Sequence, residues 1–146
     1  MEPASLVRFC QYQAAKIYAA TLANHSLDIS RDNMPQIKVD KNFEEFLIVR
    51  KIKFEKTTEI PFIIKPTQNE FNIDKIVALM QPLGFDSPIL ISKDNYCIDG
   101  HHRYIAACVL HIPLWIMRID LPIQDCLDLM KEYDGVTFKG VNEGKK

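Results

Sequence analysis

The apolar and polar positions of the chain follow two different periods. In residues 4–23 apolar side chains recur every three to four positions, which predicts a long amphipathic helix. The polar run at 26–33 ends this helix. Residues 42–52 fit a second helix, although Ile48 and Val49 leave a strand open as an alternative, because β-branched residues favour strands.

From residue 57 onward, short apolar runs alternate with amphipathic segments. Apolar runs with β-branched residues predict strands, and apolar positions on one helical face predict helices. The predicted strands are 60–64, 88–92, 96–99 and 114–119, and the predicted helices are 73–80, 102–110 and 123–133. Asn72 fits the N-cap of the first of these helices, and Pro122 fits the first helical position of the last.

This order of elements predicts a mixed α/β (α+β) fold with a small mixed sheet and packed helices. We expect a helical extension at 1–56, an α/β module at 57–134, and a C-terminal tail at 135–146 with at most a short strand. The 146 residues, of which 47% are hydrophobic and 25% charged, suffice for one soluble domain with a core.

Charge and cysteine content exclude several classes of protein. The net charge of −1 and the pI near 6.4 argue against strong nonspecific binding of duplex DNA, which depends on many lysine and arginine contacts. The four cysteines are scattered along the chain, at Cys10, Cys97, Cys108 and Cys126. Without a Cys-x-x-Cys pair they indicate buried, reduced thiols in a cytoplasmic protein rather than a disulfide framework or a zinc site.

The N-terminal helix has two interpretations. Charged residues such as Arg8 and Lys16 interrupt its apolar positions, so it is neither a signal peptide nor a membrane span. It either covers the module or offers a surface to a protein partner.

The strongest chemical signal is the sequence Asp99-Gly100-His101-His102-Arg103, where a predicted strand ends and a helix begins. The first N–H groups of a helix lack partners and carry the positive end of its dipole, so they favour anions. Glycine lets a ligand approach the backbone, and the planar guanidinium of Arg103 suits phosphate oxygens. The junction therefore predicts a phosphate-binding site.

Each residue of the junction also has a simpler interpretation. Asp99 binds Mg²⁺, accepts a proton from a hydroxyl, or only caps the helix. The adjacent imidazoles of His101 and His102 diverge and make a poor metal pair, so we expect one to donate to phosphate and the other to pack or cap. Arg103 binds phosphate or forms an ion pair with Asp99.

Through these residues the chain resembles the ParB/sulfiredoxin superfamily, over about residues 60–120. In that superfamily a glycine-histidine-arginine or glycine-x-x-arginine motif opens a helix and binds nucleotide phosphates. Residues 64–68, Ile-Lys-Pro-Thr-Gln, are similar to its first conserved box, and the Asp-Gly-x-His-Arg pattern at 99–103 is similar to that of its free serine kinases. Short proteins called ParB-like nuclease domains are frequent in bacteriophages, so the resemblance implies the cytoplasm of a bacterium or of a phage-infected host.

The resemblance implies a nucleotide-binding enzyme, with ATP or another nucleotide and Mg²⁺ as cofactors. The nucleotide-binding residues that it implies are Lys65, Gln68, Gly100, His101, His102 and Arg103. It implies catalytic roles for Asp99, which also holds Mg²⁺, and for Glu70 and His102.

The chain departs from the family patterns at three points. Gln68 stands where the serine kinases have a catalytic glutamate, and glutamine is no general base, so we consider Glu70 as the replacement carboxylate. His101 stands where sulfiredoxin has its nucleophilic cysteine. The helix-turn-helix that partition proteins carry after the module has no counterpart among the 146 residues.

Three functions therefore remain in view. The leading prediction is a kinase-like phosphotransferase or a nucleotide hydrolase that acts on a small-molecule or nucleic-acid-derived acceptor. A second is a nuclease or DNA-binding protein, although the sequence shows no group of carboxylates typical of two-metal nucleases. A third is a non-catalytic, nucleotide-gated module that binds a protein through the N-terminal helix.

Overall fold

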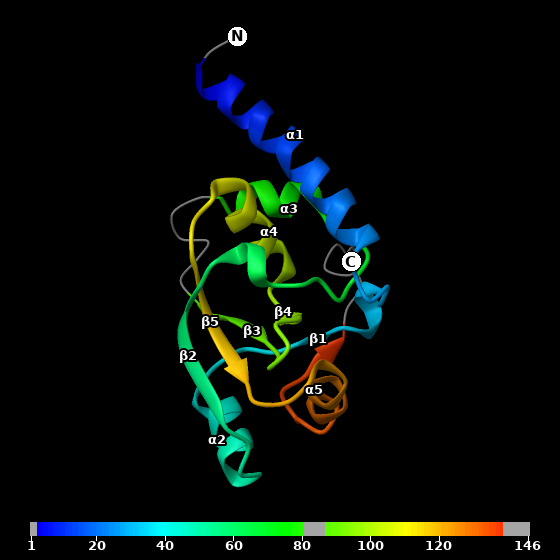
Figure 1. Ribbon diagram of the computed structural model, residues 1–146, viewed down its shortest axis with the longest axis vertical. Coiled ribbons are helices and arrows are strands. Elements are labelled where there is room, and N and C mark those ends of the chain that lie inside the picture. Colours follow the sequence, from blue (N-terminus) through cyan, green and yellow to red (C-terminus); the bar gives the residue numbers. More distant parts are fainter. Residues whose placement is uncertain (1–2, 81–86, 139–146) are drawn as a thin grey trace.

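The fold is organised around a four-stranded mixed sheet with strand order β2-β5-β3-β4, seen in Figure 1. Our computed structural model describes residues 3–80 and 87–138, with the side chains from residue 5 onward. The strands of this sheet are β2 (Phe54–Glu59), β3 (Ile89–Ile91), β4 (Cys97–Asp99) and β5 (Leu114–Ile119). β5 runs parallel to β3, and the pairs β2–β5 and β3–β4 are antiparallel. β1 (Pro35–Gln36) and β6 (Thr137–Phe138) form a separate antiparallel pair.

Helices cover both faces of the sheet. The α-helices are α1 (Pro3–Asn24), α2 (Lys41–Val49), α3 (Ile73–Ala78), α4 (His101–Leu110) and α5 (Ile123–Met130), and the 3-10 turns are η1 (Arg31–Asn33) and η2 (Pro61–Ile63). α1, α3 and α4 contribute to the core on one face, and α2 and α5 to the core on the other. In Figure 1 the first group lies above the sheet and the second below it.

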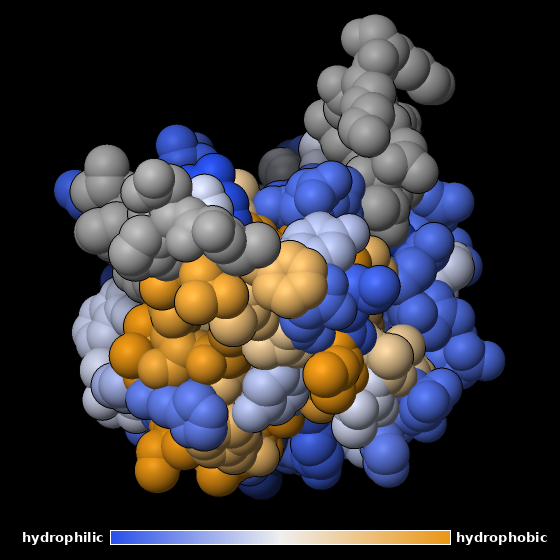
Figure 2. All heavy atoms as spheres, turned by 90° about the horizontal axis from the view of Figure 1, so that it is seen from above, coloured by the Kyte–Doolittle hydropathy of each residue, from blue (hydrophilic) through white to orange (hydrophobic). Residues whose placement is uncertain are grey.

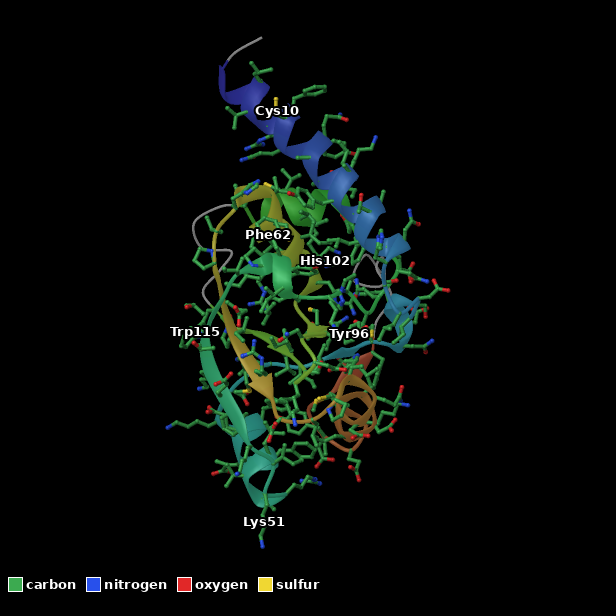
Figure 3. The ribbon with its side chains drawn as sticks, in the orientation of Figure 1. Cys10, Lys51, Phe62, Tyr96, His102 and Trp115 are labelled. Atoms are coloured by element: carbon green, nitrogen blue, oxygen red, sulfur yellow. The ribbon has the colours of Figure 1, made fainter. Side chains whose placement is uncertain are left out.

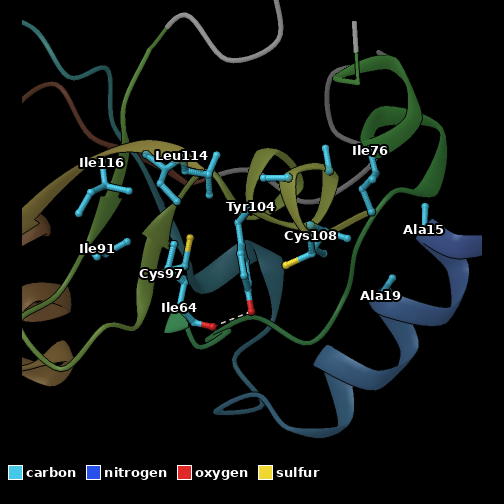
Figure 4. Packing of buried hydrophobic residues seen from close by; sticks show 14 residues of the cluster. Ala15, Ala19, Ile64, Ile76, Ile91, Cys97, Tyr104, Cys108, Leu114 and Ile116 are labelled. Atoms are coloured by element: carbon cyan, nitrogen blue, oxygen red, sulfur yellow. Dashed lines mark hydrogen bonds between the residues drawn. The ribbon is translucent and has the colours of Figure 1, made fainter. Parts of the chain in front are cut away.

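The two cores follow from the alternation of side chains along the central strands. Ile89 and Ile91 belong to the core beneath α4, whereas Leu90 belongs to the core of α2 and α5. Figure 4 shows the first core, in which the hydroxyl of Tyr104 donates to the carbonyl of Ile64 at 2.7 Å. Because both faces of β3 are buried, its sequence is continuously apolar.

The mixed α/β fold is confirmed, and most predicted elements lie within a few residues of their expected positions. The second segment is a helix, because the Asp40 side chain caps it by accepting from the N–H of Phe43, so the strand alternative is wrong. Asn72 is the N-cap of α3, as predicted. Pro122 occupies the N-cap of α5 rather than its first helical position.

The predicted strand at 60–64 is wrong. Pro61 lacks a backbone N–H and begins the 3-10 turn η2, while the strand β2 precedes it. β2 was hidden because its sequence, Phe-Glu-Lys-Thr-Thr-Glu, is mostly polar. Two of its acids pair with Arg118 of β5, at 2.5 Å for Glu55 and 2.8 Å for Glu59.

The predicted helical extension (1–56) and the predicted module (57–134) both contribute residues to each of the two cores. Ala15 and Ala19 of α1 lie in one core, and Phe43 of α2 lies in the other. The predicted tail contains β6, and its residues 139–146 lie outside the described residues. In the described part of the chain, no helix has both the length and the apolarity needed to cross a membrane.

The N-terminal helix was predicted either to cover the module or to offer a surface, and α1 has features of both. Its second half packs on α3 and α4, where Ala15 and Ala19 are buried. Its first half projects beyond the other helices in Figure 1 and exposes large apolar side chains, among them Leu6, Val7 and Phe9. Figure 2, which views the molecule from above, shows a patch of apolar side chains on the upper surface of the molecule.

Candidate functional site

The chain enters α4 directly from the end of β4, so the predicted junction is present. Gly100 lies at this junction with a φ of 103°, in the left-handed region that favours glycine. A Cβ atom there would lie 2.5 Å from Cγ2 of Ile89, so a larger residue would force Ile89 or the backbone of the junction to shift. Glycine therefore lets the backbone of α4 begin close against the sheet.

The guanidinium of Arg103 lies over the start of α4. Its Nη2 is 3.3 Å from the position of a Cβ on Gly100, and its Nη1 donates to the carbonyl of Ser87. The ion pairs among the described residues include none between Arg103 and Asp99. The other donors of this guanidinium are thus available to an anion at the helix start.

A pocket of about 130 Å³ opens at this junction. Its lining residues come from four parts of the chain and are Arg31, Gln68, Lys75, Leu79, Asp99, Gly100, His101, His102 and Arg103. Three of them are cations, on η1, α3 and α4, and one is a carboxylate. In Figure 3 the labelled His102 lies between α3 and β4, in the interior of the molecule.

Asp99 is the carboxylate of this pocket. Its Oδ2 accepts a hydrogen bond of 2.9 Å from the N–H of Ile37. Burial raises the pKa of Asp99 above its ordinary value, although the Ile37 bond and the charges of Arg103 and Arg31 act in the opposite direction. A carboxyl group with a raised pKa exchanges its proton closer to neutral pH, which suits acid–base chemistry.

The two histidines diverge, as expected for neighbours, and both hold the same strap, residues 67–72. His101 Nε2 accepts from the N–H of Thr67 at 3.1 Å, and His102 Nε2 accepts from the N–H of Asn72 at 2.9 Å. Both Nε2 atoms serve as acceptors, so neither is free to donate to a phosphate there.

Both imidazoles are neutral at pH 7. Burial lowers the pKa of His101 well below its ordinary value, with smaller contributions of the same sign from His102 and Arg31. Burial, followed by the charges of Lys75 and Arg31, lowers the pKa of His102 to about 3. A neutral ring is required because a protonated Nε2 has no lone pair for the strap N–H groups.

The residues predicted from the first conserved box lie in different places. Gln68 is buried, lines the pocket, and donates from Nε2 to the carbonyl of Glu70 at 2.8 Å. Glu70 lies outside the pocket lining, where its Oε1 accepts from the N–H of Arg31 at 2.8 Å. Lys65 also lies outside the lining, with Nζ 4.3 Å from the ring centre of Tyr96. Neither of these two charges lines the pocket at the start of α4.

Sequence reasoning missed two cations of the pocket, Arg31 and Lys75. Arg31 is only 8% exposed, and with the Gln36 amide turned to satisfy both groups its two terminal nitrogens donate to Oε1 at 3.0 and 2.6 Å. Lys75 lines the pocket from the exposed side of α3. Partial burial, then the charge of Arg31, lowers the pKa of Lys75. No local pattern marks either residue, since tertiary packing brings both to Asp99.

The cysteines supply no thiolate to the pocket lining. Cys97, Cys108 and Cys126 are buried, as predicted, but the prediction is wrong for Cys10, which is exposed on α1. Burial raises the pKa of Cys97 and raises that of Cys108 and Cys126 to about 12. The buried three are therefore thiols at neutral pH.

A divalent cation has one protein ligand available in this pocket. The part of the chain that the structure describes holds no group of three or more His, Cys, Asp and Glu side chains arranged around a metal. Asp99 alone, together with phosphate oxygens of a ligand, matches the way Mg²⁺ is held in nucleotide sites. The residues present fit a magnesium–phosphate pair better than an all-protein metal centre.

The chain matches no protein-family model, and comparison with curated proteins and with solved structures also found no match.

Proposed function

We propose that the pocket binds the phosphates of a nucleotide such as ATP, and that the protein is a small enzyme of the ParB/sulfiredoxin type. The reaction that we propose is Mg²⁺-dependent phosphoryl transfer or nucleotide hydrolysis. One observation carries this proposal: Arg31, Lys75 and Arg103 converge from three elements on the start of α4, around the single carboxylate of Asp99. Cations and helix N–H groups around one site are suited to phosphate.

The proposed chemistry depends on positioning and charge neutralisation. Arg103 binds phosphate oxygens at the helix start, and Lys75 approaches from α3. Asp99 orients the acceptor hydroxyl or water and accepts its proton, a role that its raised pKa favours. Mg²⁺, when bound beside Asp99, supplies further neutralisation of the phosphates.

Three predicted site residues hold backbone groups in place and take no part in the proposed reaction. His101 and His102 hold the strap that carries Gln68 and leads into α3. Glu70 holds the backbone of Arg31. We therefore place the catalytic carboxylate of the proposed reaction at Asp99 and assign Glu70 a structural role.

A second candidate function has an observation of its own. The exposed apolar side chains on the first half of α1, including Leu6, Val7 and Phe9, favour a protein partner and hence a nucleotide-gated binding module. A nuclease is less favoured, because the pocket offers one carboxylate and the whole chain has a net charge of −1.

Nucleotide binding and turnover are tested separately. The melting temperature is measured with ATP, ADP and CTP, with and without Mg²⁺, since a ligand of the folded state raises it. Arg103→Gln should weaken binding on the order of tenfold to a hundredfold, as expected for a lost charge-assisted bond. Lys65→Gln, which removes an exposed cation outside the pocket, is the matched control and should bind normally.

Each result bears on a different part of the proposal. Binding with release of phosphate, or with transfer to an added acceptor, supports an enzyme. Binding without turnover supports the nucleotide-gated module. The absence of any nucleotide-dependent shift, or equal loss of affinity in Arg103→Gln and Lys65→Gln, overturns the proposed site.

A further inference from the structure

We propose, on the basis of the proposed function, that the pocket selects a terminal phosphate group with two negative charges. Its ligand is then a terminal phosphate joined by a single ester or anhydride bond, such as the last phosphate of a nucleotide or the phosphate of a small monoester. Phosphodiesters and internal phosphates are excluded.

The size of the pocket limits what enters it. Its volume is about 130 Å³, which corresponds to a few water-sized groups. Leu79 and Gly100 form part of its wall, and a Cβ on Gly100 would already lie within 3.3 Å of Arg103. The space suits one phosphate group, and the remainder of a ligand must extend outside.

The charges of the pocket match a dianion. With Asp99 ionised, the lining residues Arg31, Lys75, Arg103 and Asp99 carry a net charge of +2, and Glu70, which binds the backbone N–H of Arg31, lies outside the lining. The neighbouring histidines are neutral and add none. A phosphate monoester carries about two negative charges at pH 7, whereas a diester carries one. Without a bound metal ion, a dianion therefore balances the charge of the pocket lining, whereas a diester leaves one positive charge of the lining without a partner.

Two of the three cations, Arg31 and Arg103, are held in place before a ligand arrives. Arg31 is fixed by the Gln36 side chain and by Glu70, which binds its backbone N–H. Arg103 is fixed by the carbonyl of Ser87. Such preorganisation reduces the entropy lost on binding.

The cation on α3 depends on the strap. The Asn72 side chain accepts from the N–H of Lys75 at 3.0 Å, and the N–H of Asn72 is itself bound by His102. Cations on three elements thus line the space that the phosphate would occupy. A second ester substituent would displace a cation.

The test compares ligands that differ in one ester bond. Affinities at pH 7.5 are measured by calorimetry for inorganic phosphate, phenyl phosphate and dimethyl phosphate, and for AMP, ADP and 3′,5′-cyclic AMP. We expect the monoesters to bind at least tenfold more tightly than the diesters. Equal affinity of AMP and cyclic AMP overturns the selection of a terminal phosphate.

Two variants test whether the proposed cations cause the preference for monoesters over diesters. Lys75→Gln and Arg31→Gln should each weaken phenyl phosphate about tenfold or more, with a much smaller effect on dimethyl phosphate, because each removes a charge-assisted contact. Lys65→Gln is the control. If Arg31→Gln fails to fold, Lys75→Gln on the exposed side of α3 decides the question, and unchanged affinity in it refutes the proposal.

Failure of this inference is distinguishable from failure of the proposed function. Tight binding of nucleotides without discrimination against diesters leaves the nucleotide site standing and overturns the terminal-phosphate selection. Binding of phosphate and phenyl phosphate without binding of any nucleotide supports the selection and overturns the nucleotide function. If none of these ligands binds, both proposals are wrong.

Discussion

The hydrogen bond from the N–H of Asn72 to His102 makes the stability of the protein depend on pH in a predictable way. His102 is 6% exposed, and its pKa falls from 6.5 in the unfolded chain to about 3 in the fold. Above pH 6.5 the ring is neutral in both states. Between pH 6.5 and 3 the unfolded chain binds a proton that the folded protein does not, so the free energy of unfolding decreases as the pH falls.

The size of this decrease follows from the two pKa values. Between pH 7 and pH 5, one histidine with these values removes about 2 kcal/mol from the free energy of unfolding. His101, whose pKa is also lowered well below its ordinary value, adds a further loss of the same sign. The raised pKa of Asp99 acts in the opposite direction, because the folded protein binds that proton more readily than the unfolded chain.

The matched variant is His102→Gln, whose amide oxygen can still accept from the N–H of Asn72 but does not titrate. Urea unfolding at pH 5, 6 and 7, followed by circular dichroism, gives the free energy of unfolding. We expect the wild type to lose about 2 kcal/mol more than His102→Gln between pH 7 and 5. His25→Gln, at an exposed histidine, controls for the substitution and should behave as the wild type. The same loss in wild type and His102→Gln would show that His102 is not held neutral.

Three further predictions concern the junction and its neighbours. Gly100→Ala should lower the free energy of unfolding, measured in urea, by about 1 to 3 kcal/mol, because the φ of Gly100 is positive and a Cβ there would lie 2.5 Å from Ile89. Unchanged stability would contradict the described backbone. Asp99→Asn should abolish phosphoryl transfer while nucleotide affinity remains within about tenfold in calorimetry; full activity reduces Asp99 to a structural acceptor. Glu70→Gln keeps an acceptor for the N–H of Arg31, so the free energy of unfolding should change by less than about 0.5 kcal/mol and turnover should persist. Loss of turnover at unchanged stability would assign Glu70 a catalytic role.

Local patterns predicted the junction well. The apolar run before Asp99, the glycine, and the helical spacing after it are all contained within a dozen residues. The left-handed φ of Gly100 is itself a property of that short segment. A site built from one strand end and one helix start can therefore be located from the sequence.

The remaining part of the site depends on contacts between distant segments. Glu70 and Arg31 are 39 positions apart, and Asp99 and Ile37 are 62 apart. Arg31 lies in a polar run that reads as an ordinary helix-ending loop. The place of Arg31 in the pocket follows from these long-range contacts. The spacing of apolar residues along the chain does not predict them. β2 also depends on a distant segment and was therefore not predicted. Pairing with β5 and ion pairs to Arg118 stabilise its polar sequence.

The side chains around the pocket each hold a backbone group of another segment. Asp99 holds the N–H of Ile37, His102 that of Asn72, and Glu70 that of Arg31. Removing any of these acceptors leaves an N–H group without its partner, which costs about 1 to 3 kcal/mol where the group is buried. A truncation to alanine therefore lowers stability and ligand affinity together. Amide variants keep an acceptor and remove only the charge or the titration, so the chemistry of this pocket is separable from its architecture through Asn and Gln substitutions.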